Sequence, residues 1–180
     1  MDLERAISIR RSVRKFSDKP VPEDVLSKIL LAGNDAPSSL NNQNKAFVAI
    51  VGEKAKNSLN EVVKANASSE VIERISARNK GDFNFFYNAP VLILVASNDK
   101  MYPEADCACA IENMYLRATD LGLGACWINQ LSRVEYPLLK EFLKSQGLSE
   151  DYIVYGSLAL GYSEDMIAQK SKTNRIIVVK

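Results

Sequence analysis

The chain has 180 residues, of which 47% are hydrophobic and 25% are charged, and its formal net charge is +1. This length suits a single domain spanning residues 1–180, and the balanced charge argues against a basic surface for nucleic acid. The sequence lacks an apolar run of membrane-spanning length and an N-terminal signal region, so we expect a cytoplasmic protein without a membrane partner.

The chain contains no histidine and three cysteines. Without histidine, the usual zinc sites and every histidine-dependent catalytic triad are poor candidates. Cys107 and Cys109 lie two positions apart on an expected helix, so they face different directions and cannot readily share a metal ion. We therefore expect no metal site, and we interpret the three cysteines as small buried hydrophobes in a reducing compartment.

The N-terminal region combines a short amphipathic helix, expected over residues 2–9 with Asp2 as its N-cap, with a cluster of cations at 10–15. One interpretation is a solvated charge cluster, because cations at a helix C-terminus offset its dipole. The other is a phosphate clamp, because guanidinium groups match phosphate oxygens and a serine hydroxyl adds a donor. The cluster alone leaves both interpretations open.

The rest of the chain alternates between helical and strand-like patterns, which favours an α+β or α/β layered protein. The longest expected helix carries only one narrow polar stripe, so we expect it to be buried on more than one side, either centrally or at a subunit interface. The expected helices are 23–34, 53–64, 70–79, 104–121 and 136–144, and the expected strands are 46–51, 91–96, 125–128, 152–160 and 175–179.

Two loops between these elements are distinctive. Residues 36–44 are rich in small polar side chains, and residues 82–87 are rich in aromatic ones. The sequence has neither the glycine fingerprint of dinucleotide-binding folds nor a Walker lysine. A phosphate group would therefore have to be held by side chains.

Five segments in chain order together resemble motifs of the nitroreductase family of flavin mononucleotide (FMN) enzymes. Any one of them is weak, but five in order are specific, and the resemblance covers nearly the whole chain. The segments are Arg10-Arg11-Ser12-Val13-Arg14-Lys15-Phe16, Ala36-Pro37-Ser38-Ser39-Leu40-Asn41-Asn42-Gln43, Asn88-Ala89-Pro90-Val91, Leu121-Gly122-Leu123-Gly124-Ala125-Cys126-Trp127-Ile128, and Gly161-Tyr162 followed by Arg175.

The resemblance implies an α+β fold, with a central, mostly antiparallel sheet flanked by helices, in a homodimer that shares two flavin sites. It also implies three groups of cofactor-binding residues. The first holds the phosphate and ribityl chain, the second faces the flavin from the other subunit and approaches its polar edge, and the third lies beside the reactive ring nitrogen. The groups are Arg10, Arg11, Ser12, Arg14, Lys172 and Arg175; Pro37, Ser38, Ser39, Asn41 and Gln43; and Trp127, Ile128 and Asn129.

Several of these residues also have a purely structural interpretation. Gly122 could be only a helix C-cap, and the small polar residues of 38–41 could be only turn residues. Trp127 is interpreted more readily as a core residue than as a ring that stacks on flavin. The aromatic loop could serve packing or line a substrate pocket.

The activity that the resemblance implies is that of a flavin oxidoreductase. NADH or NADPH would deliver electrons and leave before an electron-poor acceptor, such as a nitroaromatic or a quinone, binds in a ping-pong cycle. The flavin would carry the redox chemistry, so no catalytic side chain is expected. The alternative is a flavin-binding redox sensor or carrier without substantial turnover. Asn44-Lys45 and Asn129-Gln130 depart from the family pattern, and the short chain suggests a reduced lid over the substrate.

Overall fold

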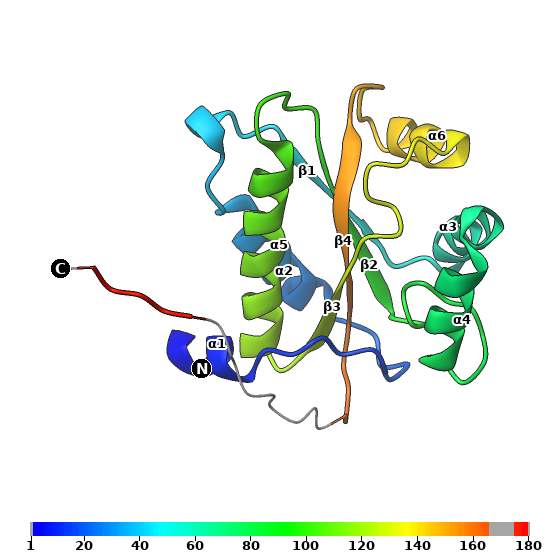
Figure 1. Cartoon of the computed structure of the whole chain (residues 1–180), viewed down its shortest axis with the longest axis horizontal. Helices are drawn as coiled ribbons and strands as arrows, with labels where there is room; N and C mark the ends of the chain where they lie inside the picture. Colours follow the sequence, from blue (N-terminus) through cyan, green and yellow to red (C-terminus); the bar gives the residue numbers. More distant parts are fainter. Residues whose placement is uncertain (1, 166–174, 180) are drawn as a thin grey trace.

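The computed structural model describes residues 2–165 and 175–179. Its centre is a four-stranded sheet in the order β1 (Lys45–Ile50), β2 (Val91–Ser97), β4 (Ile153–Gly161) and β3 (Gly124–Ile128). Each pair of neighbouring strands is antiparallel. Helices cover both faces of the sheet (Figure 1). The expected α+β fold with a central antiparallel sheet is confirmed.

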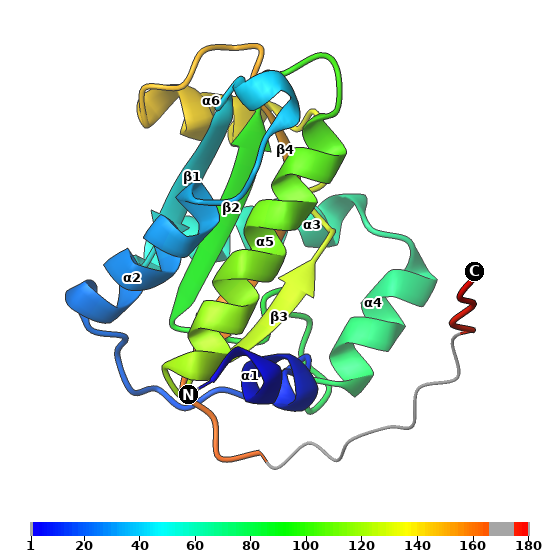
Figure 2. The ribbon, with the colours of Figure 1, turned by 90° about the vertical axis from the view of Figure 1, so that its left-hand side faces the viewer.

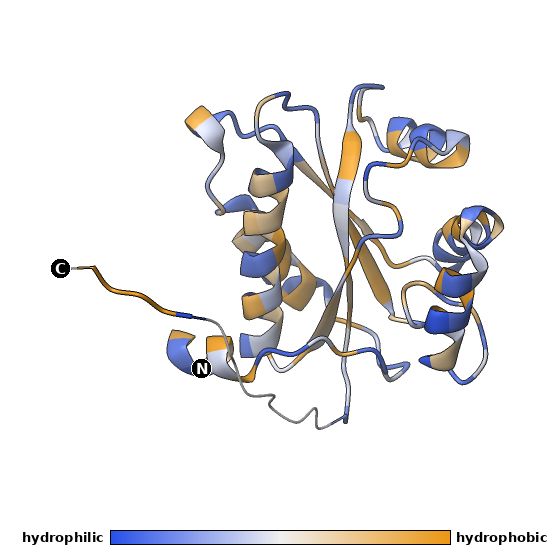
Figure 3. Cartoon of the chain, viewed as in Figure 1, coloured by the Kyte–Doolittle hydropathy of each residue, from blue (hydrophilic) through white to orange (hydrophobic). Residues whose placement is uncertain are grey.

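The central strand β2 explains why the protein has two helical layers. All seven of its residues are buried, and successive side chains point to opposite faces of the sheet. Val91, Ile93 and Val95 enter one hydrophobic cluster, while Leu92 and Leu94 enter the other. Figure 3 shows the corresponding run of hydrophobic residues through the middle of the molecule. A strand that is apolar on both faces requires cover on both.

The first layer consists of α1 (Leu3–Ile9), α2 (Glu23–Asn34) and α5 (Pro103–Asp120). Helix α5 lies across the sheet with α2 beside it, and α1 crosses near the C-terminal end of α5 (Figure 2). Asp2 caps α1 as expected, because its carboxylate accepts a hydrogen bond from the backbone N–H of Arg5 at 2.8 Å.

The second layer consists of α3 (Glu53–Asn66), α4 (Ser69–Ala77) and α6 (Pro137–Ser145). These helices lie on the opposite side of the sheet from α5 (Figure 1). Among the described residues, no helix combines the length and the apolar character needed to cross a bilayer.

Most of the expected elements are present, with ends that differ by one or two residues. The helix expected at 23–34 matches α2 at both ends. The strand expected at 175–179 is absent: these residues have no regular structure, and Ile176 is 91% exposed. A strand requires a partner, and the described part of the single chain supplies none to this segment.

Helix α5 is buried on one face in the single chain. Its buried residues recur at helical spacing from Pro103 to Ala118, while Cys109 on another face is exposed. The expected burial on more than one side is therefore not seen in the single chain. Cys107 and Cys109 do face different directions, but the interpretation of Cys109 as a buried hydrophobe is wrong.

Candidate functional site

The segment 10–16 lies along the outer edge of β3. Ser12 forms a parallel bridge with Ala125, and the backbone N–H of Val13 donates to the Ala125 carbonyl at 2.8 Å. This contact requires glycine at position 124, because a Cβ there would lie 2.7 Å from Val13 Cγ1. The first motif is therefore fixed to the sheet through its backbone, which leaves its longer side chains available.

Arg14 has the arrangement expected of a residue that binds an anion. Its guanidinium carbon lies 5.9 Å from the centre of the Tyr87 ring, and its Nη1 donates to the Ser12 carbonyl at 3.2 Å. Its Nε is buried and has no hydrogen-bond partner among the described residues. A buried donor without a partner is costly, so this N–H is suited to an acceptor oxygen of a ligand.

The other two arginines of the segment point elsewhere. Arg10 packs against α5, with its guanidinium carbon 4.7 Å from the centre of the Tyr115 ring and its Nε 3.3 Å from Glu112. Arg11 donates from Nη1 to the Ser8 carbonyl at 2.9 Å, at the C-terminal end of α1. The three guanidinium groups thus have different partners in the single chain.

The second motif is a strained loop. Ser39–Asn41 forms one turn of 3₁₀ helix, and Leu40, Asn41 and Gln43 have φ values of 50°, 56° and 54°. Such left-handed conformations are unfavourable for residues other than glycine and persist only where the surroundings impose them.

Three charged residues hold this loop, and sequence reasoning missed their role. Asp106, in the first turn of α5, accepts the backbone N–H of Ser39 on both carboxylate oxygens, at 3.1 and 3.0 Å. Asp99 accepts the Asn42 side-chain amide at 2.8 Å. Lys45 donates to the carbonyls of residues 36 and 37 at 3.1 and 3.0 Å. The departure from the family pattern at Lys45 was the available signal.

Several side chains of the loop are accessible to solvent. Pro37, Asn41 and Gln43 are exposed, while Ser38 and Ser39 are half-buried. Ser38 Oγ accepts the backbone N–H of Gln43 at 3.0 Å, which closes the loop. The turn interpretation of Ser38 is therefore realised. The exposed amides of Asn41 and Gln43 are bonded to each other, with Gln43 Nε2 donating to Asn41 Oδ1 at 3.1 Å.

The third group of candidate residues surrounds Trp127 on β3. Trp127 is 36% exposed, so its interpretation as a core residue is wrong. Its indole N–H donates to Asn129 Oδ1 at 2.8 Å, and its ring lies over Gly156, where a Cβ would lie 2.9 Å from the indole nitrogen. Ile128 is 3% exposed and belongs to the core, so its side chain is unavailable for contact.

Gly122 directly follows Leu121, the C-cap residue of α5, and completes the cap. Its φ is +78°, and its N–H donates to the Thr119 carbonyl at 3.1 Å while the N–H of Leu123 donates to the Ala118 carbonyl at 2.8 Å. This pair of bonds is the Schellman arrangement. The C-cap interpretation is confirmed, and the close approach that needs glycine occurs at Gly124 instead.

The aromatic loop serves packing. Phe85, Phe86 and Tyr87 are 0%, 1% and 7% exposed and belong to the hydrophobic cluster beneath α3, α4 and α6. The substrate-pocket interpretation does not hold for these three side chains.

The first and second motifs contact opposite ends of α5 (Figure 2). Asp106 holds the Ser39 loop, and the Tyr115 hydroxyl donates to the Arg11 carbonyl at 3.1 Å. Nine positions on a helix with a rise of 1.5 Å per residue separate these two anchors by roughly 14 Å. Of the remaining candidates, Arg175 is exposed, and Lys172 lies outside the described residues.

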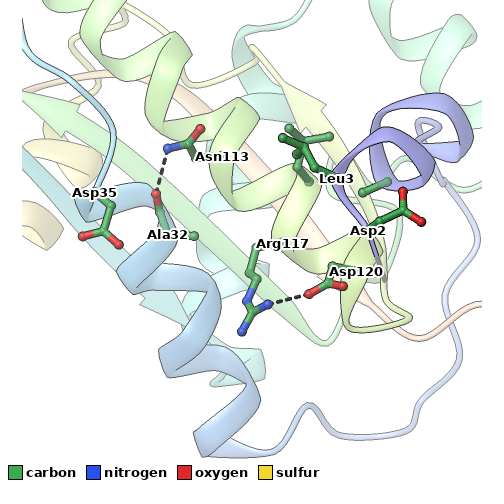
Figure 4. A pocket seen from close by; sticks show the side chains of 9 residues that line it. Asp2, Leu3, Ala32, Asp35, Asn113, Arg117 and Asp120 are labelled. Carbon is green, nitrogen blue, oxygen red and sulfur yellow. Dashed lines mark hydrogen bonds and ion pairs between the residues drawn. The ribbon is translucent and has the colours of Figure 1, made fainter.

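A separate pocket of about 340 Å³ lies between α1, α2 and α5. Figure 4 shows the hydrogen bond from Asn113 to the Ala32 carbonyl and the ion pair of Arg117 with Asp120 along its wall. None of the candidate cofactor-binding residues lines this pocket. Arg11 lines a different one, of about 260 Å³, beside Gly122 and Gly124.

The two buried cysteines are not nucleophiles. Burial raises the pKa of the Cys107 thiol to about 12. Burial also raises the pKa of Cys126, and the nearby cations, Arg14 first, offset this only in part. Both thiols stay protonated at neutral pH, and the thiolate is the reactive form.

Comparisons with known proteins agree on one family. A family model described as "Nitroreductase family" matches residues 7–162. The chain is similar to a nitroreductase with bound FMN from Bacteroides fragilis, at 36% identity, a TM-score of 0.86 and 100% coverage of both chains. A nitroreductase with bound FMN from Desulfitobacterium hafniense shares the fold, at 22% identity, a TM-score of 0.85 and 100% coverage of both chains. A relative from Archaeoglobus fulgidus named "Putative NADH dehydrogenase/NAD(P)H nitroreductase" is 30% identical over 171 residues, which cover 89% of this chain and 85% of that relative.

The anchoring of the 38–43 loop predicts a pH dependence. The N–H of Met101 and then the amide of Asn42 hold the pKa of Asp99 below its usual 3.8. A lowered pKa means that this stabilisation is full above about pH 4 and is lost as the pH falls through the lowered value. Asp99→Asn should therefore lower the melting temperature at pH 7, and the difference from the unmodified chain should shrink below pH 4. A difference that is independent of pH would contradict an ionic anchor.

Proposed function

Because the chain belongs to the nitroreductase family, we propose that it is an FMN-dependent oxidoreductase built as one domain. It takes electrons from NADH or NADPH and passes them to an electron-poor acceptor such as a nitroaromatic or a quinone. The oxidised nicotinamide nucleotide leaves before the acceptor binds. The observation that carries the proposal is the buried Nε of Arg14 in the first motif, which has no hydrogen-bond partner in the described part of the chain. The chain is also 36% identical to a nitroreductase with bound FMN.

The donors on this chain fit the phosphate end of FMN. A phosphate prefers guanidinium forks and a hydroxyl, and Arg14 and Ser12 offer these from a segment fixed to β3. Arg10 packs against α5, where its guanidinium lies over the Tyr115 ring. Arg175 and Lys172 are proposed as further cations for the same group. Arg11, which lines another pocket, is proposed for a supporting contact only.

The remaining candidates fit the flavin ring system. The exposed amides of Asn41 and Gln43, with Pro37, Ser38 and Ser39 beside them, offer directed hydrogen bonds on a loop of fixed shape. Trp127 offers a half-open aromatic surface, and the chain at Ile128 and Asn129 offers backbone groups at the end of β3. A flavin site needs an apolar wall with a few directed polar groups.

When bound, FMN supplies the electron-transfer chemistry. The residues of this chain bind it, orient it and exclude water. No side chain is proposed as a general acid or base, since solvent can supply the protons. Burial raises the pKa of Tyr115, so its hydroxyl stays protonated at neutral pH and continues to donate to the Arg11 carbonyl. The unpaired cysteines fit a reducing compartment, and we propose the cytoplasm.

We propose further that the working form is a homodimer with shared flavin sites. The first and second motifs are attached about 14 Å apart on α5 by its helical rise, so a partner could bring its second motif to the first motif of this chain. The α1 and α2 layer also exposes Leu3, Ile7 and Leu31 at 67%, 56% and 60%. Exposed apolar side chains that gather on one layer are typical of an interface.

The test of the function is the purified protein itself. We expect a flavin absorbance spectrum, release of FMN on denaturation, and steady-state oxidation of NADH or NADPH with a quinone as acceptor. Parallel lines in double-reciprocal plots would support the ping-pong order. Bound flavin without turnover would support the alternative, a redox sensor or carrier, and absence of flavin after reconstitution with FMN would contradict the proposal.

The clamp is tested by comparing two neighbouring cations. Arg14→Ala should raise the Kd for FMN by roughly ten- to a hundredfold, because a hydrogen bond to a charged group contributes about 1.5–3 kcal/mol. Lys15→Ala should change it by less than about threefold, because Lys15 is 70% exposed and pairs with Asp165 on the surface. The measurement is titration of the apoprotein with FMN. Equal losses in both variants would indicate a diffuse charge cluster rather than a clamp.

The shared site is tested by dilution. A ligand that binds only the assembled state stabilises that state, so FMN and dimer should dissociate together. Sedimentation velocity with detection at a flavin wavelength should show flavin only in the dimer across the dilution series. A monomer that sediments with its full share of flavin would rule out the shared site.

A further inference from the structure

Lys56 is buried although it carries a charge. Its side chain is 1% exposed, and its Nζ lies 2.9 Å from the carbonyl oxygens of both Ala89 and Pro90 and 2.6 Å from Glu53 Oε1. An ammonium group has three donors, and these three acceptors use all of them. An apolar side chain of similar volume would often be as stable in such a place. The distinctive contribution of the lysine is to hold two backbone carbonyls.

Both carbonyls belong to the segment 83–90, whose backbone is strained. Tyr87 and Asn88 have φ values of 56° and 55°. Asn60, one turn after Lys56 on the same face of α3, accepts the backbone N–H of Phe85 at 3.0 Å and donates to the Phe83 carbonyl at 3.2 Å. Helix α3 therefore holds this segment at both ends, which is what a strained conformation requires.

The segment 83–90 also contacts the first motif. The Tyr87 ring, 7% exposed, supports the Arg14 guanidinium at 5.9 Å. The Pro90 ring packs on Gly161, where a Cβ would lie 2.6 Å from Pro90 Cδ and 3.1 Å from Phe16 Cδ1. The segment that Lys56 anchors thus contacts Arg14 through Tyr87, and Pro90 and Phe16 both lie against Gly161.

We infer that Lys56 is a positioning residue for the Arg14 side of the phosphate clamp and that it acts through the Tyr87 ring. The ammonium fixes the residues just before β2, and the strained segment then places the Tyr87 ring against the guanidinium. The Nε of Arg14 is thereby held in its buried position, where no residue that the structure describes bonds to it. This inference rests on the proposed function, because it requires Arg14 to bind the phosphate of FMN.

The test is a double-mutant cycle measured by titrating the apoprotein with FMN. Lys56→Met keeps the volume and removes the donors, and it should raise the Kd for FMN roughly tenfold, as the loss of an outer-shell partner does at metal sites. Arg14→Lys keeps a cation, so binding stays measurable, but it loses the fork and the stacking on Tyr87. In the Arg14→Lys background, Lys56→Met should change the Kd by less than about twofold.

A matched control separates positioning from stability. Val63→Ala truncates a side chain that is 2% exposed on the same face of α3 and in the same hydrophobic cluster. It should lower the melting temperature but leave the Kd for FMN within about twofold. A loss of FMN affinity in Val63→Ala that follows the loss of stability would reduce Lys56 to a structural residue and overturn the inference.

The outcomes distinguish the two levels of the argument. If the unmodified chain does not bind FMN, or if Arg14→Lys binds it equally well, the proposed clamp fails. Two results would contradict the positioning role of Lys56 and leave the clamp standing. One is that Arg14→Lys weakens binding but Lys56→Met does not, and the other is that the two fold-changes in Kd multiply in the double variant. Should Lys56→Met not fold, Asn60→Ala removes the other α3 anchor and is expected to give the same non-additive pattern at a smaller size, while additive effects would overturn the inference.

Discussion

The packing of one face of α5 against the sheet is the constraint on which the candidate site depends. Eight side chains of α5 are buried, and they fix the helix in rotation as well as in position. Once that face is fixed, the Asp106 carboxylate must point to the Ser39 loop and the Tyr115 hydroxyl to the Arg11 carbonyl. Hydrophobic burial is not directional, but by fixing the rotation of α5 it orients these two directional hydrogen bonds.

Both loops of the site region are held in unfavourable backbone conformations by buried or half-buried polar side chains. Asp106 and Asp99 hold the loop that contains Leu40 and Asn41, while Lys56 holds the one that contains Tyr87. Each left-handed residue costs on the order of 1 kcal/mol or more, and a buried polar group left without a partner costs at least as much. A loop that relaxed its strained backbone would leave a buried polar side chain without its partner. The strained conformation is therefore the most favourable one for each loop. A fixed shape is what a site for a rigid ring system requires.

The arginines of the first motif are neighbours in the sequence but have different partners in the fold. Arg10 turns to Tyr115, Arg11 to the end of α1 and Arg14 to Tyr87. Successive side chains of an extended segment point to opposite sides, which separates Arg11 from Arg10 and Arg14 along β3. Of the three, only Arg14 combines a buried donor with the absence of a partner among the described residues.

The sequence by itself determined the elements and the family: periodicity located α2 to the residue, and β2 is apolar enough to require cover on both faces. It also identified Arg14 and the 37–43 loop as candidates from motif order. Only the tertiary structure decided the roles of Lys56, Asp99 and Asp106, because a charged residue in a sequence is expected in solvent, and its burial depends on carbonyls and N–H groups far along the chain. Lys56 does share a face of α3 with Leu59, Asn60 and Val63 at helical spacing, which was the one local sign of its burial. The exposed segment 175–179 shows the converse case. A strand forms only with a partner strand, and the sequence of one chain shows only that a segment has strand-forming residues.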